Sequence, residues 1–250
     1  MKFLGIIPAR YASTRFPGKP LADIAGKIMI RRVYEQASKG LENVVVATDD
    51  KRIIDAVKNF GGNAIMTSKK HLNGTDRCAE ALLKWQEQTG EKFDVVINIQ
   101  GDEPFIQPEQ LIKIKSCFKK KSTEIATLVK PINYMEDIFS IKEAKVVLNL
   151  KKEVIYFSRA PIPFLMKVRN HKDWVTQHLF YKHIGIYGYR ADILQKITHL
   201  KPTPLEMAES LEQLRWIEHG YRIKVEFTEF ESVSIDTPKD LKKVLELGLM

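Results

Sequence analysis

Short apolar, β-branched runs alternate along the first half of the chain with segments in which apolar residues recur at helical spacing. The runs predict strands at 3–8, 43–48, 63–66, 94–99 and 125–129. The spacing between them predicts helices at 30–37, 53–60 and 76–89. This alternation is typical of an α/β fold with a largely parallel sheet.

The third predicted helix has the most specific signals. Thr75 is its expected N-cap and Gly90 its expected stop. The apolar spacing places Ala79, Leu82 and Leu83 on the inward face.

The pattern changes after residue 131. Strands at 145–149 and 154–157 are predicted to form a hairpin around Lys151 and Lys152. The proline-interrupted stretch 160–163 cannot be a central strand. Further predicted elements are a surface connection at 167–176, strands at 183–189 and 222–227, and helices at 204–220 and from residue 238. The middle region therefore has the pattern of an insertion.

Length and composition exclude several classes of protein. A chain of 250 residues is long enough for one large α/β domain, so we expect a single domain over 1–250. No apolar run approaches the roughly 20 residues that span a bilayer, and Lys2 and Arg10 interrupt the start too soon for a signal peptide. A cytoplasmic location without membrane partners is expected. The two cysteines are too few for a disulfide framework or a structural zinc site.

The net charge of +9 is unevenly distributed, because residues 1–35 carry +5 of it. A basic chain invites a nucleic-acid-binding interpretation. That interpretation predicts spread basic patches with exposed aromatic residues, whereas this charge is concentrated in one short segment. A single polyanionic small molecule is the better-matched partner, and we expect no nucleic acid.

The cationic segment follows the first predicted strand, at residues 8–20. In an open parallel sheet, ligands bind outside the carboxyl ends of the strands. Arg10, Arg15 and Lys19 supply cations there, while Ser13 and Gly18 supply a hydroxyl and a turn. The segment matches neither a Walker loop nor a dinucleotide-binding glycine motif. It therefore predicts a different kind of phosphate site.

Two aspartates are candidate ligands for Mg²⁺. Asp102 follows the strand 94–99, so it is placed to face the cationic segment across the sheet edge. Asp236 precedes Thr237 and Pro238 at a predicted helix start. Local sequence favours a helix cap and a metal ligand about equally for Asp236.

Three later segments carry polar side chains suited to a second, acidic substrate. Arg159 ends a predicted strand, where its guanidinium could hold a carboxylate. His183 and Tyr187 are four residues apart on one strand and so share a face. Glu212 and Gln213 lie in the predicted helix 204–220 and are expected to point away from its core residues, Leu211 and Leu214.

The motifs together resemble those of the 3-deoxy-manno-octulosonate cytidylyltransferases, also called CMP-Kdo synthetases. The similar segments are IIPARYASTRFPGKPL from Ile6, NGTDR from Asn73, NIQGDEP from Asn98, YFSR from Tyr156, HIGIYGYR from His183, LEQLR from Leu211 and IDTP from Ile235. They follow the family's order and run from residue 3 to residue 238. One departure is Asn73, where the family usually has serine.

The resemblance implies a Rossmann-like, mostly parallel sheet of the nucleotide-diphospho-sugar transferase type. It also implies an inserted mixed-sheet subdomain at 131–174 that forms a homodimer. The implied nucleotide-binding residues are Pro8, Ala9, Arg10, Ser13, Arg15, Lys19, Gly74, Thr75, Arg77 and Gln100. The implied sugar-binding residues are Gln100, Arg159, His183, Tyr187, Glu212 and Gln213. Arg15, Lys19, Asp102 and Asp236 are implied to be catalytic, the two aspartates by holding Mg²⁺.

The implied reaction joins CTP and 3-deoxy-manno-octulosonate (Kdo) to give CMP-Kdo and diphosphate for lipopolysaccharide synthesis. The anomeric C2 hydroxyl of Kdo attacks the α-phosphate in line, with Mg²⁺ assisting. The alternatives left open by the sequence are a nucleotidyltransferase that uses a sialic acid or an amino analogue of Kdo.

Overall fold

The computed structural model describes residues 1–231 and 233–246, so residues 232 and 247–250 of the predicted 1–250 domain lie outside the described part. The contacts divide the chain into two compact units. Unit 1 contains residues 1–112, 188–198 and the described residues from 233 onward, and unit 2 contains residues 113–187 and 199–231. The predicted insertion at 131–174 falls within unit 2.

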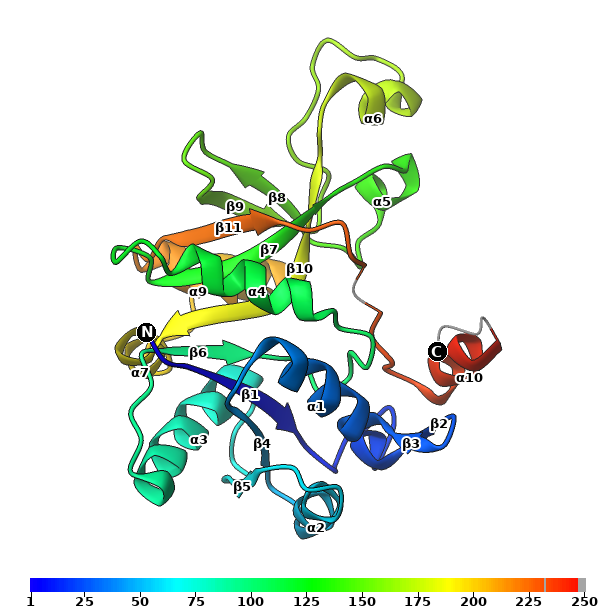
Figure 1. Ribbon diagram of the computed structural model, residues 1–250. Coiled ribbons are helices and arrows are strands. Elements are labelled where there is room, and N and C mark those ends of the chain that lie inside the picture. The colour runs from blue at the N-terminus through cyan, green and yellow to red at the C-terminus, as the bar shows by residue number, and fades with distance from the viewer. Residues whose placement is uncertain (232, 247–250) are drawn as a thin grey trace. The chain divides into compact units, whose positions relative to one another are not determined.

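Unit 1 is built on a parallel sheet with the strand order β6 (Val95–Asn98), β1 (Phe3–Ala9), β4 (Val44–Thr48) and β5 (Ala64–Met66) (Figure 1). Residue Ile6 of β1 pairs with Val45 on one side and with Asn98 on the other. These four strands match the predicted ones to within two residues at each end. A small antiparallel pair, β2 (Asp23–Ile24) and β3 (Lys27–Ile28), lies apart from this sheet.

Unit 1 also contains helices. They are α1 (Met29–Gly40), α2 (Lys51–Asn59), α3 (Gly74–Thr89), α7 (Ala191–Ile197) and α10 (Pro238–Glu246), with a 3-10 turn at Lys19–Leu21. Helix α4 (Pro108–Cys117) runs from unit 1 into unit 2. As predicted, α1 buries Ile30, Val33 and Ala37, and the helix contacts β1 and β4.

Helix α3 corrects two details of the sequence prediction. Its N-cap is Asn73, whose side-chain oxygen accepts a hydrogen bond of 2.8 Å from the Asp76 amide, so Thr75 is not the cap. The inward face also differs, because Leu82 is 1% exposed whereas Leu83 is 52% exposed. Gly90 ends the helix with φ of 72°, as expected of a left-handed C-cap glycine.

The strands of unit 2 are β7 (Ile125–Pro131), β8 (Lys145–Leu148), β9 (Val154–Ser158), β10 (Tyr181–Arg190) and β11 (Ile223–Phe227). Strand β11 pairs in parallel with β7, while β8 pairs antiparallel with β9 and with β10. The last three residues of β10 belong to unit 1. The predicted hairpin is confirmed, and so is the predicted α/β class with a mostly parallel sheet and a mixed addition.

The helices of unit 2 are short: α5 (Met135–Phe139), α6 (Trp174–Gln177), α8 (Pro204–Glu209) and α9 (Gln213–Glu218), with a 3-10 turn at His171–Asp173. The predicted single helix 204–220 is therefore wrong. Ser210 adopts a left-handed conformation with φ of 53°, which ends α8. Segment 167–176, which was expected to be a surface connection, also contributes to the core. Trp174 is 1% exposed and packs with Ile132, Ile138 and Phe180.

Among the described residues, no helix is long and apolar enough to cross a bilayer. Both cysteines are buried, and neither forms a disulfide. Burial raises the pKa of the Cys117 thiol to about 12, which keeps it protonated and unreactive at neutral pH.

Two adjacent leucines of α3 test its orientation. Leu82→Ala leaves a cavity in the core, so we expect it to lower the free energy of unfolding by about 2–5 kcal/mol. Leu83→Ala removes a half-exposed side chain and should change it by less than about 1 kcal/mol. Urea unfolding of the two variants measures both values, and equal losses would contradict the observed orientation of α3.

Candidate active site

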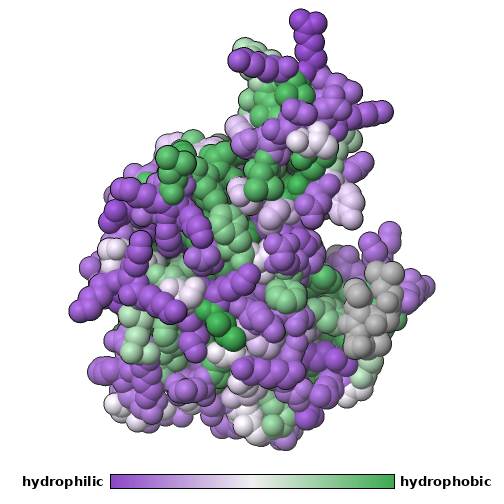
Figure 2. All heavy atoms as spheres, turned by 45° about the horizontal axis from the view of Figure 1, so that its top comes forward, coloured by the Kyte–Doolittle hydropathy of each residue, from purple (hydrophilic) through white to green (hydrophobic). Residues whose placement is uncertain are grey.

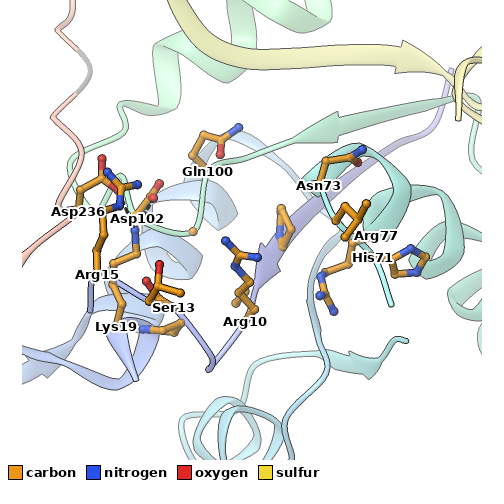
Figure 3. A pocket seen from close by; sticks show the side chains of 17 residues that line it. Arg10, Ser13, Arg15, Lys19, His71, Asn73, Arg77, Gln100, Asp102 and Asp236 are labelled. Carbon is orange, nitrogen blue, oxygen red and sulfur yellow. Dashed lines mark hydrogen bonds and ion pairs between the residues drawn. The ribbon is translucent and has the colours of Figure 1, made fainter. Parts of the chain in front are cut away.

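Unit 1 contains a pocket of about 320 Å³ where β1 and β6 end and α3 begins (Figure 3). Most of the predicted nucleotide and metal residues line it: Pro8, Ala9, Arg10, Ser13, Arg15, Lys19, Gly74, Arg77, Gln100, Asp102 and Asp236. Thr75 does not, because its side chain is buried in the first turn of α3. The pocket therefore brings together residues that are up to about 230 positions apart in the chain.

The cationic segment after β1 is a closed loop. The amides of Ser13 and Gly18 both donate to the Tyr11 carbonyl, each at 2.9 Å. The Tyr11 ring lies 3.3 Å from the guanidinium carbon of Arg52, at the start of α2. Gly18 has φ of 72°, a conformation that favours glycine, and a Cβ there would lie 3.2 Å from the Tyr11 ring. This geometry turns the chain so that Ser13, Arg15 and Lys19 all line the pocket.

Lys19 joins the two predicted metal ligands at one end of the pocket. Its ammonium lies 2.6 Å from Asp102 Oδ2 and 3.2 Å from Asp236 Oδ1. Arg15 also contacts Asp236, with 3.1 Å between Nη2 and Oδ1. Lys19 is the most enclosed of the four, with 14% of its side chain exposed against 66% for Arg15. Two cations and two carboxylates therefore form one connected cluster.

The cap interpretation of Asp236 is wrong. The cap of α10 is Thr237, whose hydroxyl accepts from the Asp240 amide at 3.2 Å. The Asp240 carboxylate in turn accepts from the Thr237 amide at 2.8 Å, which completes a reciprocal capping arrangement. The Asp236 carboxylate is thus released from capping and points toward Lys19 (Figure 3).

Main-chain contacts fix the position of the two aspartates. The Ile235 amide donates to the Asp102 carbonyl at 2.9 Å, which ties the segment before α10 to the loop after β6. Ile235 is fully buried beside Ile24, Met29 and Val244. Gly101 allows the loop after β6 to approach β1 closely, because a Cβ at this residue would lie 2.7 Å from the Pro8 carbonyl oxygen.

The other end of the pocket lies at the start of α3, with Arg10 and Gln100 between the two ends (Figure 3). Arg77 is buried there and donates to Thr67 Oγ1 at 2.6 Å and to Asp49 Oδ2 at 3.0 Å. These hydrogen bonds of the Arg77 guanidinium therefore stabilise this wall of the pocket. His71, Leu72 and Asn73 form the neighbouring rim.

Glu80 of α3 anchors this rim. Its carboxylate accepts from the Ser68 amide at 2.9 Å, contacts Lys84 at 2.6 Å and pairs with His71 Nε2. Burial by itself would raise the pKa of Glu80. The hydrogen bonds from Lys84, Ser68 and His71 outweigh that effect and lower the pKa to about 2. The loop before α3 is thus fastened by an ionised carboxylate.

The predicted sugar-binding residues other than Gln100 lie in unit 2. Arg159, at the end of β9, donates its side-chain nitrogens to the main-chain oxygens of Glu209 and Ile141, both at 2.9 Å. Glu209, which the sequence did not single out, also accepts from Ser158 Oγ at 2.6 Å and from the Arg159 amide at 2.9 Å. Arg159 therefore connects three segments of this unit.

His183 and Tyr187 lie on one face of β10, as their spacing predicts. Their rings are 5.1 Å apart, and Tyr187 packs edge-on against Trp216 at 5.1 Å. Burial lowers the pKa of His183 to about 3, so the ring is neutral at pH 7. Burial, together with the nearby Glu212 carboxylate, raises the pKa of Tyr187 well above its usual value.

Helix α9 corrects the prediction for the two residues at its start. Leu211 and Leu214 are core residues as expected. Gln213, however, is only 6% exposed, so it does not point away from the core. Glu212 is half-buried at the N-cap position. The break at Ser210 resets the helix phase, which is why the single-helix prediction oriented Gln213 wrongly.

Comparisons with known proteins identify the family. The profile of the Cytidylyltransferase family matches residues 4–225. The 3-deoxy-manno-octulosonate cytidylyltransferase of Parabacteroides distasonis is 57% identical over 98% of this chain and 97% of its own length. The protein of the same name from Bacteroides thetaiotaomicron is 55% identical over 98% of both chains. This chain belongs to the 3-deoxy-manno-octulosonate cytidylyltransferase family.

A solved structure agrees with this assignment. The CMP:2-keto-3-deoxy-manno-octonic acid synthetase complexed with CTP has a TM-score of 0.89 and 40% sequence identity, and the match covers 100% of this chain and 99% of that one. The resemblance inferred from motifs is confirmed, as is the prediction that the chain is a cytidylyltransferase enzyme. The functional roles of individual residues stay predictions.

The pocket includes residues that sequence reasoning missed. Thr14, Pro20, His71, Leu72 and Gly101 line it beside the predicted set, together with Asn73. Thr14, Pro20 and Gly101 lie within motifs already recognised, so their place in the loops was the available signal. His71 and Leu72 precede the NGTDR motif, and only the fold shows that they reach the pocket.

Acid titration tests the anchoring role of Glu80. The pKa of Glu80 is about 2 in the folded protein, and its ordinary value is 4.5. The contacts of the ionised Glu80 carboxylate therefore contribute stability above pH 4.5, and this stability is lost as the pH falls toward 2. Glu80→Gln removes this titration. Between pH 5 and pH 2, we expect the wild type to lose about 2–3 kcal/mol more unfolding free energy than the variant. Urea unfolding across this range measures the difference, and parallel losses would contradict the anchor.

Proposed function

We propose that this enzyme transfers the cytidylyl group of CTP to Kdo, producing CMP-Kdo and diphosphate for lipopolysaccharide synthesis. The observation that carries the proposal is the pocket of unit 1, where Arg10, Arg15 and Lys19 converge with Asp102 and Asp236. Cations at the carboxyl ends of parallel strands suit a triphosphate. The family supplies the identity of the nucleotide and of the sugar acid.

The reaction needs positioning and charge neutralisation more than a protein nucleophile. The C2 hydroxyl of Kdo forms a bond to the α-phosphorus of CTP while the bond from that phosphorus to the bridging β-oxygen breaks. The hydroxyl proton is released, and diphosphate leaves with the bonding electron pair. Arg15 and Lys19 would hold the β- and γ-phosphates and stabilise the charge that develops on them.

The polar loop residues would orient the triphosphate. Arg10 lies between the two ends of the pocket, where its planar guanidinium can hold two phosphate oxygens at once (Figure 3). The Ser13 oxygen accepts from the Phe16 amide at 3.3 Å, and its hydroxyl hydrogen can still be donated to a phosphate.

The donor set at the charged end fits Mg²⁺. Asp102 and Asp236 offer two oxygen ligands from adjoining loops, and a cation, the Lys19 ammonium, already lies between them. No group of three or more His, Cys, Asp or Glu side chains among residues 1–231 and 233–246 could hold a metal alone. This suits Mg²⁺, which takes one or two carboxylates and completes its shell with water and substrate phosphates. When bound, Mg²⁺ would polarise the α-phosphate and lower the pKa of the attacking hydroxyl.

Unit 2 would supply the groups that hold the sugar acid. The neutral His183 ring would act by hydrogen bonding and not by charge. Its Nε2 lies 2.9 Å from Thr127 Oγ1, and the Thr127 hydroxyl donates to the Ile186 carbonyl at 2.7 Å. With the Thr127 hydroxyl hydrogen on the Ile186 carbonyl, Nε2 would donate to Thr127 and Nδ1 would be left as an acceptor for a sugar hydroxyl. Arg159 would meet the substrate carboxylate while its other contacts keep it in place.

Removing either carboxylate tests the metal assignment. Asp102→Asn and Asp236→Asn keep the side-chain size but remove the charge that holds Mg²⁺, so we expect each to lower kcat by ~100-fold or more. Diphosphate release from CTP and Kdo measures this. Asp55→Asn, on the exposed face of α2, is the matched control and should retain activity.

Near wild-type turnover in both variants would exclude the metal site. The same assay with a sialic acid and an amino analogue of Kdo in place of Kdo tests the acceptor. If either compound were turned over faster than Kdo, that compound, and not Kdo, would be the acceptor.

We also infer that the enzyme is a homodimer formed through residues 131–174 of unit 2. This segment exposes large apolar side chains that a lone subunit would leave in water, notably Ile141 at 74%, Phe164 at 67% and Met166 at 84%. Figure 2 shows hydrophobic surface among the polar side chains of this part of unit 2. Apolar surface of this kind favours a second copy of the chain.

Light scattering tests the dimer. The wild type should have about twice the subunit mass of 28.8 kDa. The double variant Phe164→Glu, Met166→Glu should be a monomer, because charges at an apolar interface are costly to bury. Lys167→Glu, within the same segment but already charged, is the control. A monomeric wild type would contradict the inference.

A further inference from the structure

Lys19 is held in the place where the proposed function puts a divalent cation. Its ammonium contacts both candidate metal ligands, at 2.6 Å and 3.2 Å, and only 14% of its side chain is exposed. A lysine that binds phosphate oxygens could extend freely into the pocket, but here the Lys19 ammonium contacts two carboxylates. The two aspartates are therefore paired with a cation of the chain itself.

The charges of the cluster balance. Lys19 and Arg15 carry two positive charges, and Asp102 and Asp236 carry two negative ones. A divalent cation that entered alone would leave the site with an excess of two positive charges and would displace the lysine into water without a partner. CTP that entered alone would bring its phosphate charge beside two carboxylates. When the cation and CTP enter together, the cation binds the two carboxylates and the triphosphate binds Lys19.

We propose that Lys19 acts as a lock on the metal site, so that the divalent cation binds tightly only when a triphosphate draws Lys19 away from Asp102 and Asp236. The proposal rests on the proposed function and adds an order to it. Metal and nucleotide bind with positive coupling because each removes the other's electrostatic obstacle. By linkage, the metal strengthens triphosphate binding by the same factor.

Arg15 is a natural comparison within the cluster. Of the two carboxylates of the cluster it contacts Asp236, and 66% of its side chain is exposed, so water screens its charge. Lys19 instead touches both carboxylates from an enclosed position. If the lock depends on this bridging contact, loss of Lys19 should affect metal binding much more than loss of Arg15, although each variant removes one positive charge.

The test is binding of Mn²⁺, as a spectroscopic substitute for Mg²⁺, to the full-length protein without nucleotide. The EPR signal of free Mn²⁺ gives the dissociation constant. We expect Lys19→Met to tighten Mn²⁺ binding about tenfold or more. Arg15→Leu should tighten it less. Lys39→Met, which removes an exposed lysine of α1 outside the pocket, should stay within about twofold of wild type.

Two further variants locate the effect. Adding Asp102→Asn to Lys19→Met should cancel the gain, which shows that the metal binds at the released carboxylates. Lys19→Gln is the second variant should Lys19→Met fail to fold, and it should show the same tightening. Circular dichroism of each variant confirms folding.

The outcomes separate the lock from the proposed function. Unchanged or weaker Mn²⁺ binding by Lys19→Met and Lys19→Gln overturns the lock, even if Asp102→Asn still lowers Mn²⁺ binding in the presence of CTP. If Asp102→Asn and Asp236→Asn leave Mn²⁺ binding unchanged with CTP present, the metal site of the proposed function is itself wrong. A gain in Lys19→Met that Asp102→Asn cancels supports both.

Discussion

The parallel pairing of β1 between β4 and β6 is the constraint on which the active site depends. Parallel strands start at one edge of a sheet and end at the other, so the loops after β1 and β6 emerge side by side. The first loop carries Arg10, Arg15 and Lys19, and the second carries Asp102. The buried apolar side chains of β1 and β6 hold this register, because a slip would misplace the core residues. Core packing thereby places the loop that carries Lys19 next to the loop that carries Asp102.

The C-terminal segment completes the site by a different physical means. Asp236 belongs to no strand of the sheet, and its position comes from the Ile235 amide bonded to the Asp102 carbonyl and from the buried Ile235 side chain. The separate cap at Thr237 leaves the Asp236 carboxylate available to Lys19. Ile235 is thus anchored by packing, Asp236 lines the pocket, and Thr237 caps α10.

Much of the fold was predictable because its signals are local. The buried strands of unit 1 are apolar runs, and α1 shows a clear helical period, so both were found to within a few residues. The signals failed where tertiary structure decided the outcome. No glycine or proline marks Ser210, whose left-handed conformation splits the predicted helix 204–220. Capping by Asn73 and not Thr75 is a matter of two residues, which local rules do not resolve. The motifs include most of the pocket residues, but His71 lies before the NGTDR motif, and its place in the pocket and its contact with Glu80 are visible only in the fold.

The choice of lysine at position 19 and arginine at position 15 follows from the geometry of the cluster. An ammonium is a compact charge with three hydrogens in different directions, so it can bridge two carboxylates that come from separate loops. A guanidinium is a planar fork that suits two oxygens of a single group, and its bulk would push Asp102 and Asp236 apart. The flexible stem of lysine also allows its charge to exchange carboxylates for phosphates without a change in the backbone. The +9 net charge therefore matters less for its size than for the position of Lys19, which bridges two carboxylates and would meet phosphates in the proposed complex.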